Sequence, residues 1–354
     1  MTRTLGAVLT AVAVGTYLVH LAAAQPQSSL EFLRTELAFS AGDLRELAPG
    51  RAVVRSLDTS DPREIAIAGA VRVALSPSQY IAELRDIVAF KKHEAVVQIG
   101  TFGRPPRVED LANLTLDTDH LEDLEDCRVF DCDFQLPRDA IQRVRQAVRW
   151  SDRTAARDDA NRIIRAMLTD LVARYLAQGD AALMTYEDER PPVDVAAEFQ
   201  SLISAPPAVL RQFPALERHI AAFPRARTPA AEDLIYWSKE DIGPQVIISV
   251  THMVIAPVET GPVVYAAASK QLYGSHYFDS SLGLTLLLRD DQPSSTVLVY
   301  INRSRVDALD GFLGGLKRAI VRSRARAAME DTLTRIRTRL PARVGRNREQ
   351  GFRD

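Results

Sequence analysis

The stretch Thr296-Val-Leu-Val-Tyr-Ile-Asn302, with the long segment that follows it to Leu340, decides the fold. Residues 296–302 are mostly β-branched or aromatic, which predicts a strand inside a sheet. From Val306 onward, apolar residues recur mostly at steps of three and four, which predicts one long amphipathic helix with basic residues on its other face. We expect Pro341 to end this helix, because proline lacks an N–H and clashes with the preceding turn. The apolar positions are Leu309, Leu313, Leu316, Ile320, Met329, Leu333, Ile336 and Leu340.

Other segments carry strand patterns, most of them in meander order near the C-terminus. A helix as long as 306–340 needs a broad surface for its apolar stripe, and the strands just before it are the best candidate. The sequence therefore predicts an α+β fold in which a sheet of about eight strands is covered by the C-terminal helix. The predicted strands are 51–57, 64–75, 95–102, 127–136, 245–257, 263–278, 282–288 and 297–302.

The middle third of the chain lacks strand patterns. Residues 138–186 and 195–223 have mostly helical spacing and are bracketed by proline-rich joins, which predicts a helical insertion. Upstream, Ser76 and Pro77 suit the N-cap and first position of a helix over Ser78–Phe90. We expect a signal peptide (1–24), an N-terminal part of the sheet domain (25–150), the insertion (151–230), a C-terminal sheet and closing helix (231–341) and a flexible basic tail (342–354).

Two segments resemble the START-like (SRPBCC, helix-grip) superfamily. The first, Gly69-Ala-Val-Arg-Val-Ala-Leu-Ser-Pro-Ser-Gln-Tyr-Ile-Ala-Glu-Leu-Arg-Asp86, looks like that family's strand, small polar turn and short helix. The second is the meander and long helix from Lys270 to Leu340. The resemblance implies a curved antiparallel sheet that grips the C-terminal helix, with an apolar cavity between them. The chain as a whole also resembles a family of exported bacterial proteins.

The N-terminus has the pattern of an export signal. Arg3 supplies the charged region, Leu5 to Leu21 the apolar region and Ala22 to Ala24 the small-residue cleavage site. The alternative is a membrane anchor, for which the apolar run is at the short end. We expect a periplasmic or secreted protein. In such a protein Cys127 and Cys132 predict a disulfide, and a soft-metal or redox pair is the alternative.

Charge is unevenly distributed along a chain whose net charge is −2. Residues 109–133 are acidic, whereas the segment from Lys317 to Arg353 is strongly basic. This predicts either internal charge pairing or peripheral contact between the basic C-terminal helix and an anionic membrane. Arginine greatly outnumbers lysine, which we attribute to genomic base composition, so we expect no nucleic-acid partner.

The most polar strand segment is Ser269 to Asp279, and it supplies most candidate site residues. Strand alternation places Lys270 and His276 on one face and Tyr273 on the other. A lysine and a histidine on a largely apolar face predict anchors for the polar head of a ligand.

His252 lies on the apolar face of an earlier strand, so pairing of the two strands could bring it near His276. Asp279 could then orient an imidazole or complete a metal site, although we predict no metal. The structural alternative is that both histidines are core or edge residues with satisfied hydrogen bonds.

Asn302 and Arg303 lie where the last strand is expected to meet the helix, and Arg303 or Arg305 could hold a carboxylate or phosphate. The more conservative interpretation is that Ser304 or Asp307 caps the helix and the arginines are solvated. Trp237, within a segment expected to precede the second run of strands, is predicted to line the core or a cavity wall with its indole N–H in contact with water.

The sequence contains no G-x-S-x-G, H-E-x-x-H or C-x-x-C pattern, which removes common hydrolase and zinc-protein classes. We therefore expect an exported carrier or binding protein for an apolar small molecule, possibly a lipid, with no cofactor. One alternative is an enzyme of the same fold that uses His276 with Asp279 or Tyr273 as an acid–base pair. The other is a peripheral envelope protein with a structural role.

Overall fold

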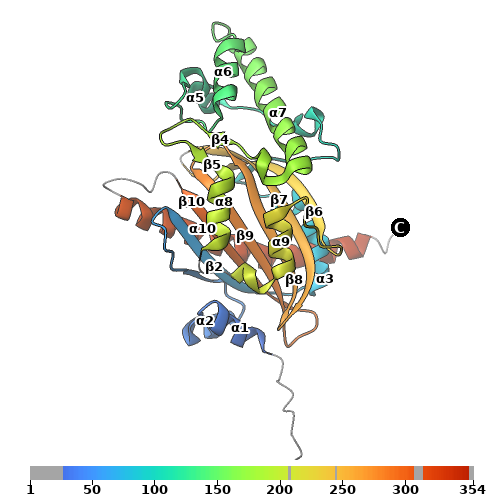
Figure 1. The fold of residues 1–354 in the computed structure, drawn as a ribbon. Helices are drawn as coiled ribbons and strands as arrows, with labels where there is room; N and C mark the ends of the chain where they lie inside the picture. The colour runs from blue at the N-terminus through green and yellow to red at the C-terminus, as the bar shows by residue number, and fades with distance from the viewer. Residues whose placement is uncertain (1–26, 206–208, 244, 307–313, 351–354) are drawn as a thin grey trace, which may run out of the picture.

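A single eight-stranded antiparallel sheet organises the molecule (Figure 1). The structure, a computed structural model, describes residues 27–205, 209–243, 245–306 and 314–350. The strand order is β1-β2-β10-β9-β8-β7-β6-β3, and β4 and β5 form a separate small hairpin. The strands are β1 Val53–Ser56, β2 Glu64–Val73, β3 Val96–Thr101, β4 Thr185–Tyr186, β5 Val193–Asp194, β6 Glu232–Asp241, β7 Val246–Thr260, β8 Val263–Gly274, β9 Phe278–Arg289 and β10 Thr296–Val306.

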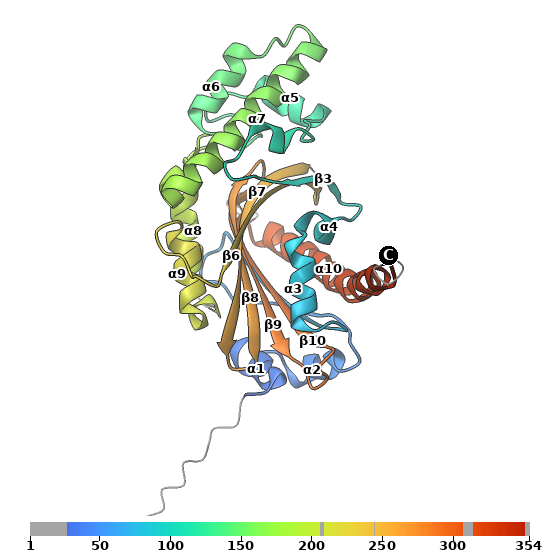
Figure 2. The ribbon, with the colours of Figure 1, turned by 90° about the vertical axis from the view of Figure 1, so that its right-hand side faces the viewer.

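Helices cover both faces of this sheet, as Figure 2 shows. The concave face holds α3, α4 and α10, whereas α8 and α9 lie on the convex face and α5, α6 and α7 extend from one end. The predicted α+β fold, with a helical insertion and a long C-terminal helix packed on the sheet, is confirmed. The helices are α1 Ser29–Glu36, α2 Ala41–Leu47, α3 Pro77–Arg85, α4 Ile87–Lys91, α5 Thr118–Asp126, α6 Arg138–Ala147, α7 Arg153–Gln178, α8 Val195–Ser204, α9 Pro214–Ala222 and α10 Gly314–Gln350, with short 3-10 turns η1 Val108–Leu111, η2 Gly179–Ala182 and η3 Val209–Gln212.

The strand predicted at 296–302 is an interior strand of the sheet. β10 pairs with β2 from Thr296 opposite Val73 to Arg305 opposite Glu64, and it pairs with β9 on its other side. The N-cap predicted at Ser76 is confirmed, because its hydroxyl accepts a hydrogen bond from the Gln79 N–H. The helix predicted to Phe90 divides at Asp86, whose side chain caps α4.

The apolar stripe of α10 packs on the sheet through its C-terminal half. Met329, Leu333 and Leu340 are buried there. Gly69 on β2 permits this close approach, because a Cβ at that position would lie 2.5 Å from Cδ1 of Leu333. Leu316, by contrast, is exposed, so the predicted inward-facing stripe is wrong at this end of the helix. The same holds for Ile320. The predicted apolar positions 309 and 313, and the predicted signal peptide, lie outside the described residues.

Predictions for three further parts of the chain are wrong. Pro341 does not end the helix, and the tail predicted to be flexible is helical to Gln350, because the Arg343–Glu83 ion pair and the packing of Val344 hold this part of α10 in place. Residues 127–136 form no strand, since the disulfide between Cys127 and Cys132 closes a tight loop with only an isolated bridge.

The third correction concerns β6. Residues 236–240 are predicted to precede the second run of strands, but they belong to a full strand that lies between β7 and β3. Asp233, Ser238 and Glu240 interrupt the apolar pattern of this segment, and tertiary partners satisfy each of these side chains.

Candidate functional site

Polar side chains form a row across the concave face of five neighbouring strands, β6 to β10. Side chains at alternate positions of a strand share a face. The concave positions are identified by Tyr236, Met253, Ala267, Leu287 and Leu298, which all belong to the apolar cluster beneath α3 and α10. Counting by two from these positions reaches further residues of the same face, and eight of the polar ones form a group that we call the polar belt. They are Ser238 on β6, Ser249 and Thr251 on β7, Ser269 and Gln271 on β8, Ser281 on β9, and Asn302 and Ser304 on β10.

Strand register places the belt residues side by side, and several hydrogen-bond one another. Ser238 lies opposite Ser249, and their hydroxyl oxygens are 3.1 Å apart. Ser281 lies opposite Ser304, at 2.9 Å between the hydroxyl oxygens. Asn302 joins this pair, because its amide donates to Ser281 at 3.3 Å and its carbonyl oxygen accepts from Ser304 at 2.9 Å. A serine hydroxyl has one donor and two acceptor positions, so these groups keep capacity for a further partner.

Half of the belt is partly accessible to solvent. Ser249, Ser269, Ser281 and Asn302 are half-buried, whereas Ser238, Thr251, Gln271 and Ser304 are buried, as are Val250 and Leu282 on the convex face. The reason is the placement of α10, which packs chiefly against β2 and β1 and leaves the central strands to the shorter helices. The belt therefore contains four ordered hydrogen-bonding side chains that a small molecule can reach.

A charged and aromatic group lies at the β6 end of the belt. Lys91 from α4 donates to Glu240 at 2.6 Å, and its Nζ lies 5.3 Å from the ring centroid of Tyr236. Burial alone would raise the pKa of Glu240, but the nearby Lys91 and Ser238 outweigh it and lower that pKa. Burial also raises the pKa of Tyr300, so its phenol stays protonated and able to donate. This end of the belt thus carries both fixed charges and a neutral donor.

The other part of the concave face is apolar. Ile255, Ala267 and Leu298 continue the belt strands in this direction and pack with Tyr80 and Leu84 of α3. The polar and apolar parts share one continuous surface of the sheet. The aliphatic residues themselves are buried, so the apolar surface that an amphipathic molecule can contact beside the belt is formed by half-buried side chains of the same cluster, such as Tyr300 and Ile336.

Two predicted site residues, His252 and Lys270, lie on the convex face instead. His252 is fully buried, with one ring nitrogen 2.9 Å from the Tyr175 hydroxyl and the other 3.0 Å from Asp233 Oδ1. Burial lowers the pKa of His252 although Asp233 opposes that effect, so the imidazole is neutral around neutral pH. Burial likewise lowers the pKa of Lys270 to about 8, and its ammonium pairs with Asp180.

The expected approach of His252 and His276 is not formed. The ring nitrogens of His276 lie 2.7 Å from Ser275 Oγ and 3.3 Å from Asp123 Oδ2. The predicted alternation fails because the pairing of β8 with β7 shifts by one residue at Leu272.

Three further residues of the predicted ligand set have partners within the protein. They are Tyr273, Asp279 and Trp237. The Tyr273 hydroxyl is buried and donates to the backbone carbonyl of Gln135 at 3.1 Å. Asp279 pairs with Arg63 at 3.5 Å. Trp237 is a core residue, as predicted, but its indole N–H donates to the carbonyl of Asp110 at 2.9 Å and not to water.

Arg303 and its neighbour Arg305 are buried, so their expected solvation is wrong. Arg303 pairs with Glu64 at 2.6 Å, and Arg305 pairs with Glu198 at 2.5 Å. These pairs join β10 to β2 and to α8. Among the eight predicted ligand residues, Asn302 belongs to the polar belt.

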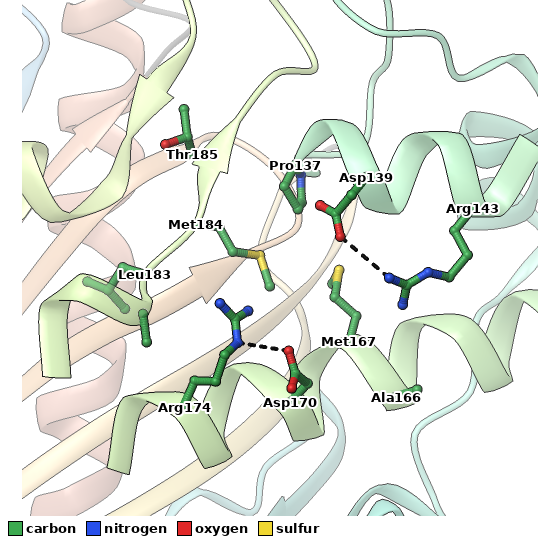
Figure 3. A pocket seen from close by; sticks show the side chains of 11 residues that line it. Pro137, Asp139, Arg143, Ala166, Met167, Asp170, Arg174, Leu183, Met184 and Thr185 are labelled. Carbon is green, nitrogen blue, oxygen red and sulfur yellow. Dashed lines mark hydrogen bonds and ion pairs between the residues drawn. The ribbon is translucent and has the colours of Figure 1, made fainter. Parts of the chain in front are cut away.

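A pocket of about 650 Å³ lies away from the belt, between α6, α7 and residues 182–185 (Figure 3). Met167 and Met184 contribute its apolar surface. Two ion pairs border it, Asp139 with Arg143 at 3.5 Å and Asp170 with Arg174 at 2.8 Å. Because both pairs are largely exposed and mutually neutralised, they give the pocket no preference for an anion or a cation.

Within the described ranges, no group of three or more His, Cys, Asp or Glu side chains is arranged to hold a metal ion. The same part of the chain contains no helix long and apolar enough to cross a membrane.

Comparison with known proteins identifies no relative. No protein family model, curated protein or solved structure matches the chain. The resemblance to START-like proteins therefore stays a prediction from the sequence.

Proposed function

We propose that this protein binds or carries an amphipathic small molecule on the concave face of its sheet. The observation that carries the proposal is the polar belt, in which hydroxyl and amide groups are held in register across five strands and half of these side chains remain partly accessible. A lipid or another molecule with a long apolar part and a neutral polar group is the class of ligand that fits best.

The binding mode follows from the chemistry of the two parts of the face. The apolar part of the ligand would lie along half-buried side chains of this face, such as Tyr300 and Ile336, where removal of its surface from water supplies most of the affinity. Its polar group would exchange hydrogen bonds with Ser269, Ser281 and Asn302, which fix its orientation. Lys91 and Glu240 neutralise each other, so the belt favours a hydroxyl or amide head over a strongly ionised one.

An acid–base enzyme is less well supported. Both ring nitrogens of His276 have partners other than Tyr273 and Asp279, and the Tyr273 hydroxyl is buried. Export from the cytoplasm stays part of the proposal, supported by the pattern of residues 1–24 and by a disulfide typical of oxidising compartments.

The proposal is tested by filling the belt. Ser269→Phe puts an aromatic ring on the half-buried centre of the belt, and Ser294→Phe puts the same ring on an exposed turn between β9 and β10. Binding of a fluorescent long-chain alcohol is measured by titration for both variants, after thermal unfolding has verified that each is folded.

We expect Ser269→Phe to weaken binding about tenfold or more, while Ser294→Phe leaves it unchanged. Equal affinity for the two variants, or no saturable binding by the wild-type protein to a panel of neutral and anionic long-chain probes, would contradict the proposal.

A further inference from the structure

The N-terminal end of α10 presents apolar side chains to solvent. Leu316 and Ile320 are 62% and 46% exposed, and they lie one helical turn apart on the same face. Figure 1 shows this end of the helix extending beyond the sheet on the side of β2. Val321 and Ala325 face the other way and pack against the apolar cluster of the concave face. The helix is therefore anchored on one side and uncovered on the other.

The charge around this apolar pair is strongly positive. α10 contains eleven Lys and Arg residues but only three Asp and Glu residues, in a chain whose net charge is −2. Lys317 and Arg324 are exposed beside Leu316 and Ile320. The helix is also held in place there, because Arg318 donates to the backbone carbonyl of Asp61 at 2.8 Å.

We propose that this end of α10 docks the protein on an anionic lipid surface. Leu316 and Ile320 would enter the boundary between head groups and acyl chains, while Lys317 and Arg324 would lie at the level of the anionic head groups. Helices that bind at the membrane interface combine an apolar edge with flanking basic residues in this way.

Charge favours a lipid surface over a second copy of the chain. A symmetric dimer through this face would bring the same basic helix against itself, because equivalent patches meet in an isologous interface. An anionic bilayer instead supplies the opposite charge to Lys317 and Arg324 at this end of the helix. This inference does not depend on the proposed ligand-binding function.

The test uses the full mature protein and vesicles of phosphatidylcholine, with or without phosphatidylglycerol, in a co-sedimentation assay. Leu316→Ser/Ile320→Ser removes the apolar pair, and Lys317→Gln/Arg324→Gln removes two charges. The matched control is Ile242→Ser, since Ile242 is 52% exposed but lies between β6 and β7. The oligomeric state of each protein is measured in parallel by light scattering.

We expect binding only to vesicles that contain phosphatidylglycerol, with a partition coefficient that falls as salt is raised. Each double substitution should lower that coefficient about tenfold or more, because each removes two of the groups that bind the interface. Ile242→Ser and Ser269→Phe should leave it unchanged, which separates docking from ligand binding.

Three results would overturn the proposal. They are equal binding to neutral vesicles, unchanged binding of Leu316→Ser/Ile320→Ser, and a wild-type dimer that this double substitution converts to monomer. The last result would identify a second copy of the chain as the occupant of the face.

Discussion

Replacement of Arg303 by methionine should strongly destabilise the protein, because it leaves the buried carboxylate of Glu64 without its ion-pair partner. Glu64 is 0% exposed and Arg303 is 4% exposed, and the guanidinium contacts Oε1 of Glu64 at 2.6 and 2.7 Å. Loss of one member of a buried ion pair costs about 3–5 kcal/mol. Arg303 also donates to the backbone carbonyl of Ala205 at 2.7 Å, a hydrogen bond worth about 1 kcal/mol. Arg305 stays nearby and offsets part of the loss, so we expect a net cost of about 4 kcal/mol at neutral pH.

The cost should decrease in acid. Burial raises the pKa of Glu64 above 4.5, although Arg303 opposes that effect. A carboxyl whose folded-state pKa is raised favours folding at low pH, and its contribution is lost as pH rises through the folded pKa. Without Arg303 the pKa of Glu64 rises further. The difference between variant and wild type should therefore shrink as pH falls towards 4.5, the ordinary value of this group.

Urea denaturation of Arg303→Met and of Glu64→Gln/Arg303→Met, at neutral and mildly acidic pH, measures these effects. The double variant should recover a substantial part of the stability lost by the single one, since it no longer buries an uncompensated charge. A loss below about 1 kcal/mol for Arg303→Met at neutral pH would refute the reasoning. A double variant no more stable than the single one would do so as well.

Three further predictions concern the packing of α10, a buried imidazole and the disulfide. Leu333→Ala should cost about 2–5 kcal/mol and Leu316→Ala less than about 0.5 kcal/mol, because only Leu333 is buried; equal losses in urea denaturation would contradict this. Burial lowers the pKa of His252, so the stability that this imidazole contributes is present above pH 6.5, the ordinary pKa of histidine, and is lost as the pH falls below that value. If His252→Gln leaves the pH dependence of unfolding unchanged, His252 does not have this role. Replacing Cys127 and Cys132 together by alanine should cost about 2 kcal/mol, the contribution of a short closed loop, and the midpoint of thermal unfolding measures it; an unshifted midpoint would argue against a stabilising disulfide.

Local patterns were sufficient to predict the main elements of the fold. Residues 296–302 are mostly β-branched, whereas apolar residues after Val306 recur at steps of three and four. The first pattern predicts a strand and the second a helix, and β10 and α10 have these types. Pro341 shows what local patterns miss. The helix continues past this proline because Arg343 pairs with Glu83, a residue distant in the sequence. The polar residues of β6 were misleading for the same reason, because their partners come from other segments.

The candidate site was only partly predictable. Histidine, lysine and arginine were predicted as site residues because their side chains commonly bind ligands or transfer protons. His252 and Arg303 instead stabilise the fold through buried pairs. The polar belt has a weaker signal in the sequence, because three of its five strands carry two polar side chains two residues apart, such as Ser249 and Thr251. That signal becomes informative only when strand register aligns these positions across five strands, and register cannot be read from one strand alone.

The most direct test of the central claim is native mass spectrometry of the mature protein purified from its own exporting host, followed by extraction into organic solvent. We expect a bound amphipathic molecule in the wild-type protein and its loss or reduced occupancy in Ser269→Phe. A wild-type protein that is empty, and stays empty after incubation with envelope lipids, would contradict the claim that the concave face binds such a ligand.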